Sequence, residues 1–222
     1  MALNSTQINQ LDFAIQQNLL PAIYFDFVTE KSVHAASMSE VENVIGQQLR
    51  SAATQAVKHG LANIIYWGYA NTEYRDQWVS HFLQRANDDV LRDFQRELAA
   101  QGALLDLIQL KKIRLPLYSG MSSLSKVLTF LNPQDYCVLD APLAQLKAVP
   151  NRALHQMTFQ TGRQVAVTQH NQTIHNQWRA ECAAINQKYF AGKYKTVEIQ
   201  RGFSYLIDKQ PIDLTKKIYE DF

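Results

Sequence analysis

The chain contains few cysteines, glycines and prolines and no long apolar run. Its two cysteines, Cys137 and Cys182, are too few for the disulfide framework of a small secreted domain. Eight glycines and six prolines in 222 residues do not suit a loop-rich all-β protein. No apolar run approaches the ~18 residues of a membrane helix, and residues 1–10 have neither a basic start nor an apolar core. We therefore expect a helical, cytoplasmic protein with no membrane association.

The motifs of several enzyme classes are also missing. His170 and His175 are five residues apart, and no His-Glu-x-x-His or paired Cys-x-x-Cys motif is present, so we expect no metal site. Neither common glycine-rich phosphate loop nor Gly-x-Ser-x-Gly occurs, which disfavours nucleotide-dependent transfer and α/β-hydrolase chemistry. No cofactor is expected.

The charge is unevenly distributed along the chain. Residues 1–106 hold 7 basic and 12 acidic side chains, a balance of −5, whereas residues 107–197 hold 11 basic and 3 acidic ones, a balance of +8. A basic central segment favours a phosphate-bearing partner, because each neutralised phosphate releases counterions. A solvated basic face is the alternative interpretation.

Apolar periodicity predicts about nine or ten helices with little or no β structure. Ser39 and Glu42 resemble a capping box that opens a helix extending through Val57 and ending at Gly60. Asn87 is expected to cap another helix. Further helices are expected over about 171–190 and 197–208. We expect residues 1–222 to form a single compact unit, which could consist of two subdomains. The strongest signal for an internal boundary lies at Thr161–Thr168.

Residues 103–131 predict a helix, a hairpin and a second helix, Met121–Leu131, which Pro133 stops. A turn that enters a helix leaves the first backbone N–H groups of that helix available to a phosphate. We therefore expect the following residues to contact DNA phosphates: Lys111, Lys112, Arg114, Ser119, Gly120 and Ser122. The alternative is a plain helical corner in which Gly120 only relieves backbone strain.

The stretch LPLYSGMSSLSKVLTFLNPQDYCVLDAPLAQL, residues 115–146, resembles the helix–hairpin–helix DNA glycosylases, especially their bacterial 8-oxoguanine glycosylase-like branch. Leu117–Ser122 is similar to the hairpin of that family, with Ser122 where a second glycine is usual. The segment Tyr136-Cys-Val-Leu-Asp140 is similar to the apolar run that ends in the family's catalytic aspartate. Residues 60–210 resemble the family more loosely.

The resemblance implies excision of a damaged base, an oxidised purine for example, from double-stranded DNA. Asp140 would be the catalytic carboxylate, and we expect it to cap a helix over Ala141–Lys147 while facing a pocket shared with Lys126. Direct register places Leu124 at the family's lysine position, so Lys126 either occupies a displaced site or points into solvent. An aromatic sandwich for the extruded base would come from Trp67, Tyr69, Trp78 and Phe82, for which core packing is the alternative.

Two other functions remain open at this point. One is a non-catalytic helix–hairpin–helix DNA-binding protein, and the other is an α-helical interaction protein with no nucleic-acid role. The sequence does not specify the oligomeric state or the damaged base.

Overall fold

A computed structural model describes residues 2–17, 20–101, 105–160 and 164–222. The chain forms two compact units. Unit 1 comprises residues 1–19, 120–125 and 133–222, and unit 2 comprises residues 20–119 and 126–132. The described residues are mostly helical, which confirms the expected predominance of helix. None of their helices is long and apolar enough to cross a membrane.

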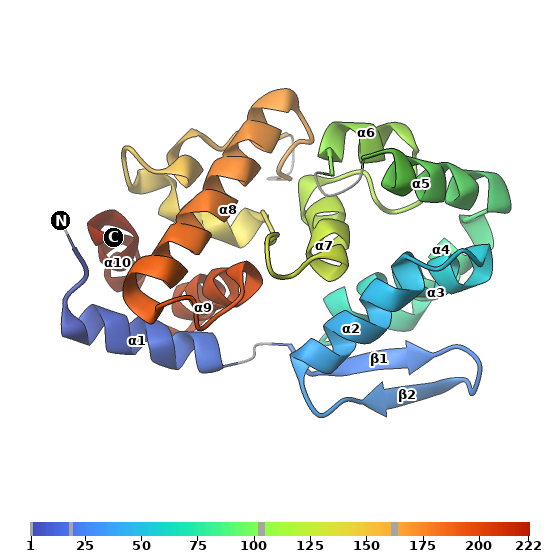
Figure 1. Cartoon of the computed structure of the whole chain (residues 1–222), viewed down its shortest axis with the longest axis horizontal. Coiled ribbons are helices and arrows are strands. Elements are labelled where there is room, and N and C mark those ends of the chain that lie inside the picture. Colours follow the sequence, from blue (N-terminus) through green and yellow to red (C-terminus); the bar gives the residue numbers. More distant parts are fainter. Residues whose placement is uncertain (1, 18–19, 102–104, 161–163) are drawn as a thin grey trace. The chain divides into compact units, whose positions relative to one another are not determined.

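Unit 2 is a group of helices with one small β-hairpin (Figure 1). Its elements are β1 (Ile23–Asp26), β2 (Lys31–His34), α2 (Met38–Leu49), α3 (Thr54–Gly68), α4 (Arg75–Arg85), α5 (Asp88–Gln101), α6 (Leu107–Lys112) and the C-terminal part of α7 (Met121–Leu131). Asn87 caps α5 as expected, because its side-chain oxygen accepts the Val90 N–H at 3.0 Å. Gly102, a residue type that favours the end of a helix, lies outside the described residues.

The start of α2 differs from the capping box expected at Ser39. The N-cap is Ser37, whose hydroxyl accepts the Glu40 N–H at 3.3 Å. Glu42 lies further along α2 and is buried. The expected helix is also wrong in extent, because α2 ends at Leu49, and Val57 and Gly60 lie inside a second helix, α3. A Cβ at Gly60 would lie 3.0 Å from Gln48 Cβ and 3.1 Å from Leu49 N. The glycine therefore permits close packing of α3 on α2.

The hairpin of β1 and β2 was not expected from the sequence. The strands pair antiparallel from Ile23 opposite His34 to Asp26 opposite Lys31. Asn63 of α3 satisfies the backbone of β1, accepting the Phe25 N–H at 2.7 Å and donating to Phe25 O at 3.1 Å. The β1 strand is thus stabilised by a side chain 38 residues away in the sequence. No local sequence pattern reveals such a contact.

Unit 1 is built on the long helix α8 (Gln169–Phe190). Around its buried Trp178 lie Phe203 and Tyr219, whose rings meet the indole edge-on at 5.6 Å. The other elements are α1 (Ser5–Gln16), the N-terminal part of α7, the 3-10 helices η1 (Ala141–Ala148) and η2 (Ala153–Gln156), α9 (Thr196–Lys209) and α10 (Ile212–Asp221). The helices expected over 171–190 and 197–208 are confirmed within two residues at each end.

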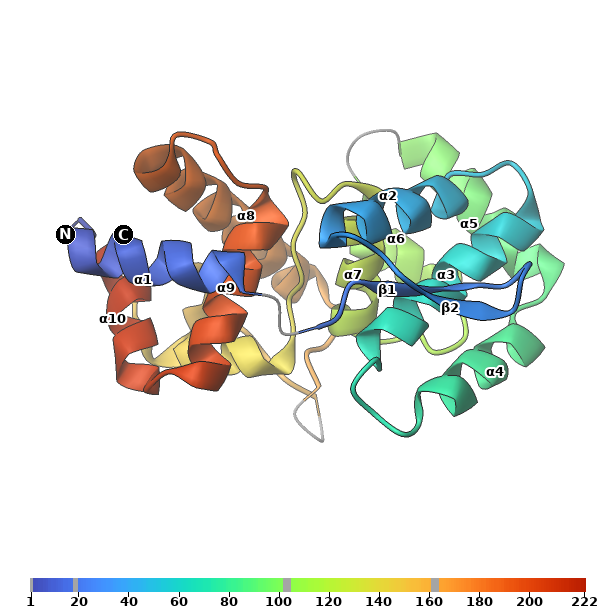
Figure 2. The ribbon, with the colours of Figure 1, turned by 90° about the horizontal axis from the view of Figure 1, so that it is seen from below.

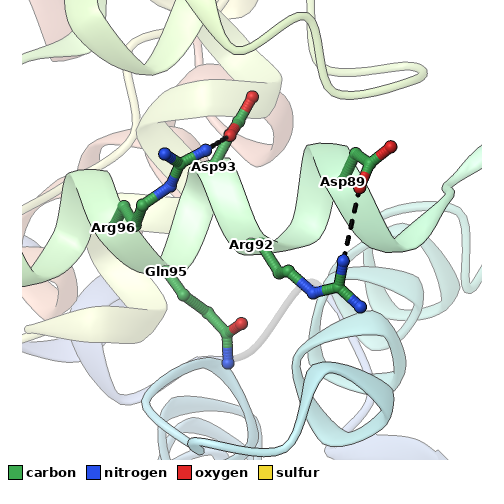
Figure 3. A pocket seen from close by; sticks show the side chains of 5 residues that line it. All are labelled: Asp89, Arg92, Asp93, Gln95 and Arg96. Atoms are coloured by element: carbon green, nitrogen blue, oxygen red, sulfur yellow. Dashed lines mark hydrogen bonds and ion pairs between the residues drawn. The ribbon is translucent and has the colours of Figure 1, made fainter.

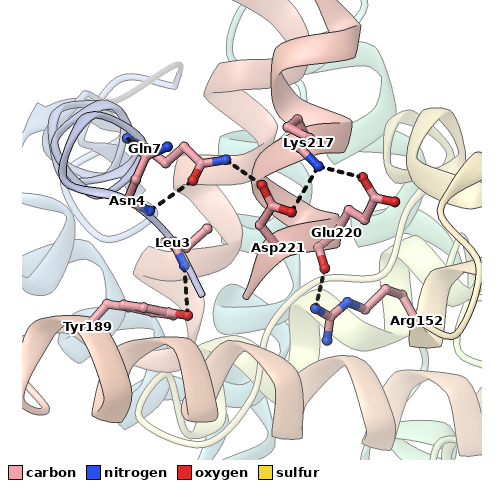
Figure 4. Close-up of polar contacts among 8 residues, drawn as sticks. All are labelled: Leu3, Asn4, Gln7, Arg152, Tyr189, Lys217, Glu220 and Asp221. Atoms are coloured by element: carbon pink, nitrogen blue, oxygen red, sulfur yellow. Dashed lines mark hydrogen bonds and ion pairs between the residues drawn. The ribbon is translucent and has the colours of Figure 1, made fainter. Parts of the chain in front are cut away.

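Segments from both ends of the chain pack together in unit 1. Figures 1 and 2 show α1 alongside α9, and a Cβ at Gly202 of α9 would lie 2.6 Å from Ile15 Cγ1. The Gln7 side chain of α1 donates to the Asp221 carboxylate of α10 at 2.9 Å, a contact drawn in Figure 4. Both sides of the boundary expected at Thr161–Thr168 belong to this one unit, and residues 161–163 lie outside the described residues.

Candidate functional site

The turn between α6 and α7 joins the two helices at the positions that the sequence indicated. Asp106 caps α6 by accepting the N–H groups of Ile108 at 2.7 Å and Gln109 at 3.2 Å. The second helix has the expected bounds, Met121–Leu131. This part of the chain therefore has the element order, helix, turn and helix, on which the DNA-binding prediction depends.

The backbone of this turn does not depend on its glycine in the expected way. The left-handed residues are Arg114, with φ of 59°, and Leu117, with φ of 67°, whereas Gly120 has no positive φ. A Cβ at Gly120 would meet no heavy atom within 4 Å. Gly120 thus relieves neither strain nor crowding, and the open space above it permits close approach by a ligand.

One backbone N–H group at the start of α7 is hydrogen-bonded within the protein. The Met121 N–H donates to Val165 O at 3.2 Å, so this first N–H group of α7 is not available to a phosphate, contrary to expectation. The cause is the segment before α8, which runs past the start of α7. Ser119 is exposed, whereas Ser122 is half-buried.

The three basic residues before the turn are candidates for phosphate contact. Lys111 and Lys112 are exposed in the last turn of α6, where cations are stabilised by the helix dipole. Lys112 Nζ donates to Gln109 Oε1 at 2.9 Å. Arg114 follows in the turn itself and is exposed as well. These side chains are accessible to a phosphate.

Lys126 belongs to unit 2 and is half-buried. Its Nζ lies 3.4 Å from the position that a Cβ would occupy on Gly68, the last residue of α3. The ammonium group therefore lies against the C-terminal end of a helix, where its charge is favourable. This placement differs from the expected alternative of a lysine that points only into solvent.

Asp140 belongs to unit 1 and is the last residue of a segment without regular secondary structure, residues 136–140. Leu139 N–H donates to Ser125 Oγ of α7 at 3.1 Å. Asp140 occupies the N-cap position of η1, but its side chain makes no capping hydrogen bond, and the helix that follows is a 3-10 helix. The expected cap is therefore wrong, although the Oδ1 atom of Asp140 is buried.

A buried histidine fixes the same segment from α8. His175 Nε2 lies 2.7 Å from Cys137 O, and burial lowers the pKa of His175 to about 4, so its ring is neutral at pH 7. The Arg179 guanidinium lies 3.8 Å over the Tyr136 ring. From the sequence, His175 was considered only as a metal ligand. The sequence does contain a signal for the burial of His175, which is its position on the apolar stripe of α8 between Ile174 and Trp178.

The two cysteines lie near each other in unit 1. Both are buried free thiols. Burial raises the pKa of the Cys182 thiol well above its ordinary range, so the thiol stays protonated.

The four aromatic residues proposed for the base sandwich fall into two pairs. Trp67 and Phe82 are buried, meeting Phe130 and Tyr118 edge-on at 5.2 Å and 5.8 Å, as expected for core residues. Tyr69, by contrast, is 42% exposed, and its ring stacks on Trp78 at 6.1 Å. Tyr69 is therefore accessible for stacking on a base and the half-buried Trp78 partly so, whereas the other two are not.

Unit 2 has two surface pockets. One of about 400 Å³ on α5, drawn in Figure 3, is lined by side chains that pair within the helix, including Arg92 with Asp89 and Arg96 with Asp93. The other, of about 700 Å³, lies between the hairpin and α4, and Phe25, Phe27 and Tyr66 contribute to its walls. The guanidinium of Arg75 lies 4.2 Å over the Tyr66 ring in this groove. Sequence reasoning missed it because the hairpin itself was not expected.

The described residues contain no cluster of three or more histidine, cysteine or acidic side chains that could hold a metal ion. Comparison with protein-family models, with curated proteins and with solved structures finds no match.

Proposed function

We propose that the protein is a DNA glycosylase of the helix–hairpin–helix type, which releases a damaged base, such as an oxidised purine, by cleaving its N-glycosidic bond. The proposal rests on the family resemblance of residues 115–146 and on the way these residues fold. An α6–turn–α7 element with exposed basic side chains precedes a segment that ends in Asp140.

One hydrogen bond carries the proposal. It joins the Leu139 N–H to the Ser125 hydroxyl at 3.1 Å. Leu139 immediately precedes Asp140, and Ser125 immediately precedes Lys126 on the same helix. The residues that precede Asp140 and Lys126 are thus hydrogen-bonded to each other, although these two neighbours, Leu139 and Ser125, are 14 positions apart in the sequence.

The chemistry follows from the residue types. Breaking the N-glycosidic bond develops positive charge on the deoxyribose, and the Asp140 carboxylate stabilises that charge. Lys126, when its amine is neutral, attacks C1′ as the bond to the base breaks and goes on to form a Schiff base with the sugar. Tyr69 and Trp78 supply the exposed aromatic surface for the extruded base.

The DNA backbone contacts in this proposal come from Lys111, Lys112 and Arg114 and, at the start of α7, from Ser119, Gly120 and Ser122. The open space above Gly120 supports close approach of a phosphate. Such contacts are independent of sequence and make affinity fall with salt.

A non-catalytic DNA-binding protein is the second candidate. The observation that favours it is the position of Lys126 Nζ against the end of α3 at Gly68, where the ammonium group stabilises the helix instead of reacting. In that case the protein binds duplex DNA and releases no base.

One set of assays separates the candidates. Gel shifts on duplex DNA at two salt concentrations test for phosphate binding, and release of oxidised or alkylated bases tests for catalysis. We expect Asp140→Asn to retain duplex affinity and lose base release, and Lys126→Gln to lose Schiff-base trapping by borohydride. Duplex binding without base release in the wild type would favour the second candidate, and no duplex binding would contradict both.

A further inference from the structure

The hydroxyl of Ser125 forms hydrogen bonds to two backbone groups of unit 1. Its side chain is fully buried, and its hydroxyl donates to Ser122 O at 3.3 Å, one turn back along α7. The same oxygen accepts the Leu139 N–H at 3.1 Å. A serine hydroxyl can donate one hydrogen bond and accept others, so both contacts are satisfied together.

The segment that Ser125 contacts depends on such side-chain partners. Residues 136–140 form no regular secondary structure, so helix or sheet bonding does not satisfy their backbone groups. His175 of α8 is bonded to Cys137 O at 2.7 Å, and Ser125 accepts the N–H of Leu139. These two buried side chains hold alternate residues of the segment.

We infer that Ser125 is a positioning residue for base excision, setting the backbone of Leu139 and thereby the placement of Asp140. This inference rests on the proposed function. Ser125 is buried and bonded to the backbone, so it acts through Asp140 and not on the DNA itself. A misplacement of about 1 Å can reduce a reaction rate about 10²-fold, so removing this bond is expected to slow excision strongly.

Ser123 provides a matched control on the same helix. Its hydroxyl also donates to a carbonyl three residues back, Gly120 O at 2.9 Å, and the side chain is half-buried. Ser123→Ala therefore removes the same group and the same type of local bond without removing the acceptor for Leu139.

The experiment compares wild type, Ser125→Ala, Ser125→Thr and Ser123→Ala. Amide hydrogen exchange of Leu139 reports the bond itself, and the single-turnover rate of 8-oxoguanine release, with the duplex dissociation constant measured in parallel, reports its consequence. Circular dichroism confirms the fold of each variant. If Ser125→Ala does not fold, Ser125→Cys replaces it, since sulfur keeps the shape but is a weak acceptor.

We expect Ser125→Ala to accelerate Leu139 exchange by about tenfold or more, because a buried donor then has no partner. We also expect it to slow base release by about 10²-fold with little change in duplex affinity. Ser125→Thr, which retains the hydroxyl, should restore both properties, and Ser123→Ala should resemble wild type.

Unchanged Leu139 exchange in Ser125→Ala would overturn the inference. Faster exchange with base release equal to that of Ser123→Ala would overturn it too, while leaving the proposed function intact. A wild-type protein that releases no base would instead overturn the proposed function, and the positioning role with it.

Discussion

Protonation of His175 should destabilise the fold below pH 6.5. The imidazole is fully buried, stacks beside Tyr136 at 6.4 Å and bonds to Cys137 O, and burial together with Arg179 holds its pKa at about 4. In the unfolded chain the pKa returns to its ordinary value of 6.5. As the pH falls, the unfolded chain therefore binds the proton first, so stability is full above pH 6.5 and decreases down to about pH 4.

The size of the effect follows from the same values. Each pH unit in this window costs about 1.4 kcal/mol, so the fall from pH 6.5 to about 4 removes about 3 kcal/mol of unfolding free energy. For a chain of this size, that corresponds to a decrease in Tm of roughly 6–12 °C.

Urea unfolding of wild type and His175→Gln, at intervals from pH 7.5 to pH 4, measures this contribution. Glutamine can still donate to Cys137 O but does not titrate. We expect the variant to be less stable at pH 7.5 and the difference to shrink as the pH falls. Parallel pH profiles, or a His175 pKa near 6.5 by NMR, would refute the reasoning. Burial raises the pKa of Glu181, so the titration of this residue stabilises the fold as the pH falls. Glu181 is present in both proteins.

The remaining predictions concern packing and DNA binding. Gly202→Ala should destabilise the protein by about 1–3 kcal/mol, because its Cβ would lie 2.6 Å from Ile15 Cγ1. Gly120→Ala, with open space around its Cβ, should leave the urea midpoint nearly unchanged, and equal destabilisation of the two variants would contradict this packing argument. Lys112→Glu combined with Arg114→Glu should weaken duplex binding and reduce the slope of log affinity against log salt by about 0.9 for each phosphate that the protein no longer neutralises. An unchanged slope in titrations from low to moderate salt would show that this surface does not bind DNA.

Local signals in the sequence predicted several helices well, although the single helix expected from Ser39 to Gly60 is two helices, α2 and α3. The bounds of α7 follow from its apolar stripe and from Pro133, and Asn87 caps α5 as its side chain suggests. Two errors came from choosing the wrong member of a local pattern. Ser37 caps α2 in place of Ser39, and Gly60 serves close packing in place of helix termination.

What the sequence did not reveal depends on partners far along the chain. The edge of β1 is satisfied by Asn63, and the start of α7 is bonded to Val165. The role of Ser125 is of the same kind, because its hydroxyl serves a backbone group 14 residues away. Asp140 resembled a helix cap because aspartate favours that position, yet its side chain makes no capping bond.

The most direct test of a glycosylase is release of free 8-oxoguanine from a duplex that contains one such base, under single-turnover conditions with saturating protein. We predict release by wild type and at least a hundredfold slower release by Asp140→Asn at equal DNA occupancy, about 2.7 kcal/mol of transition-state stabilisation. Equal rates for the two proteins would contradict a catalytic role for Asp140. No release by wild type from this duplex, or from duplexes with other oxidised or alkylated bases, would contradict the glycosylase function itself.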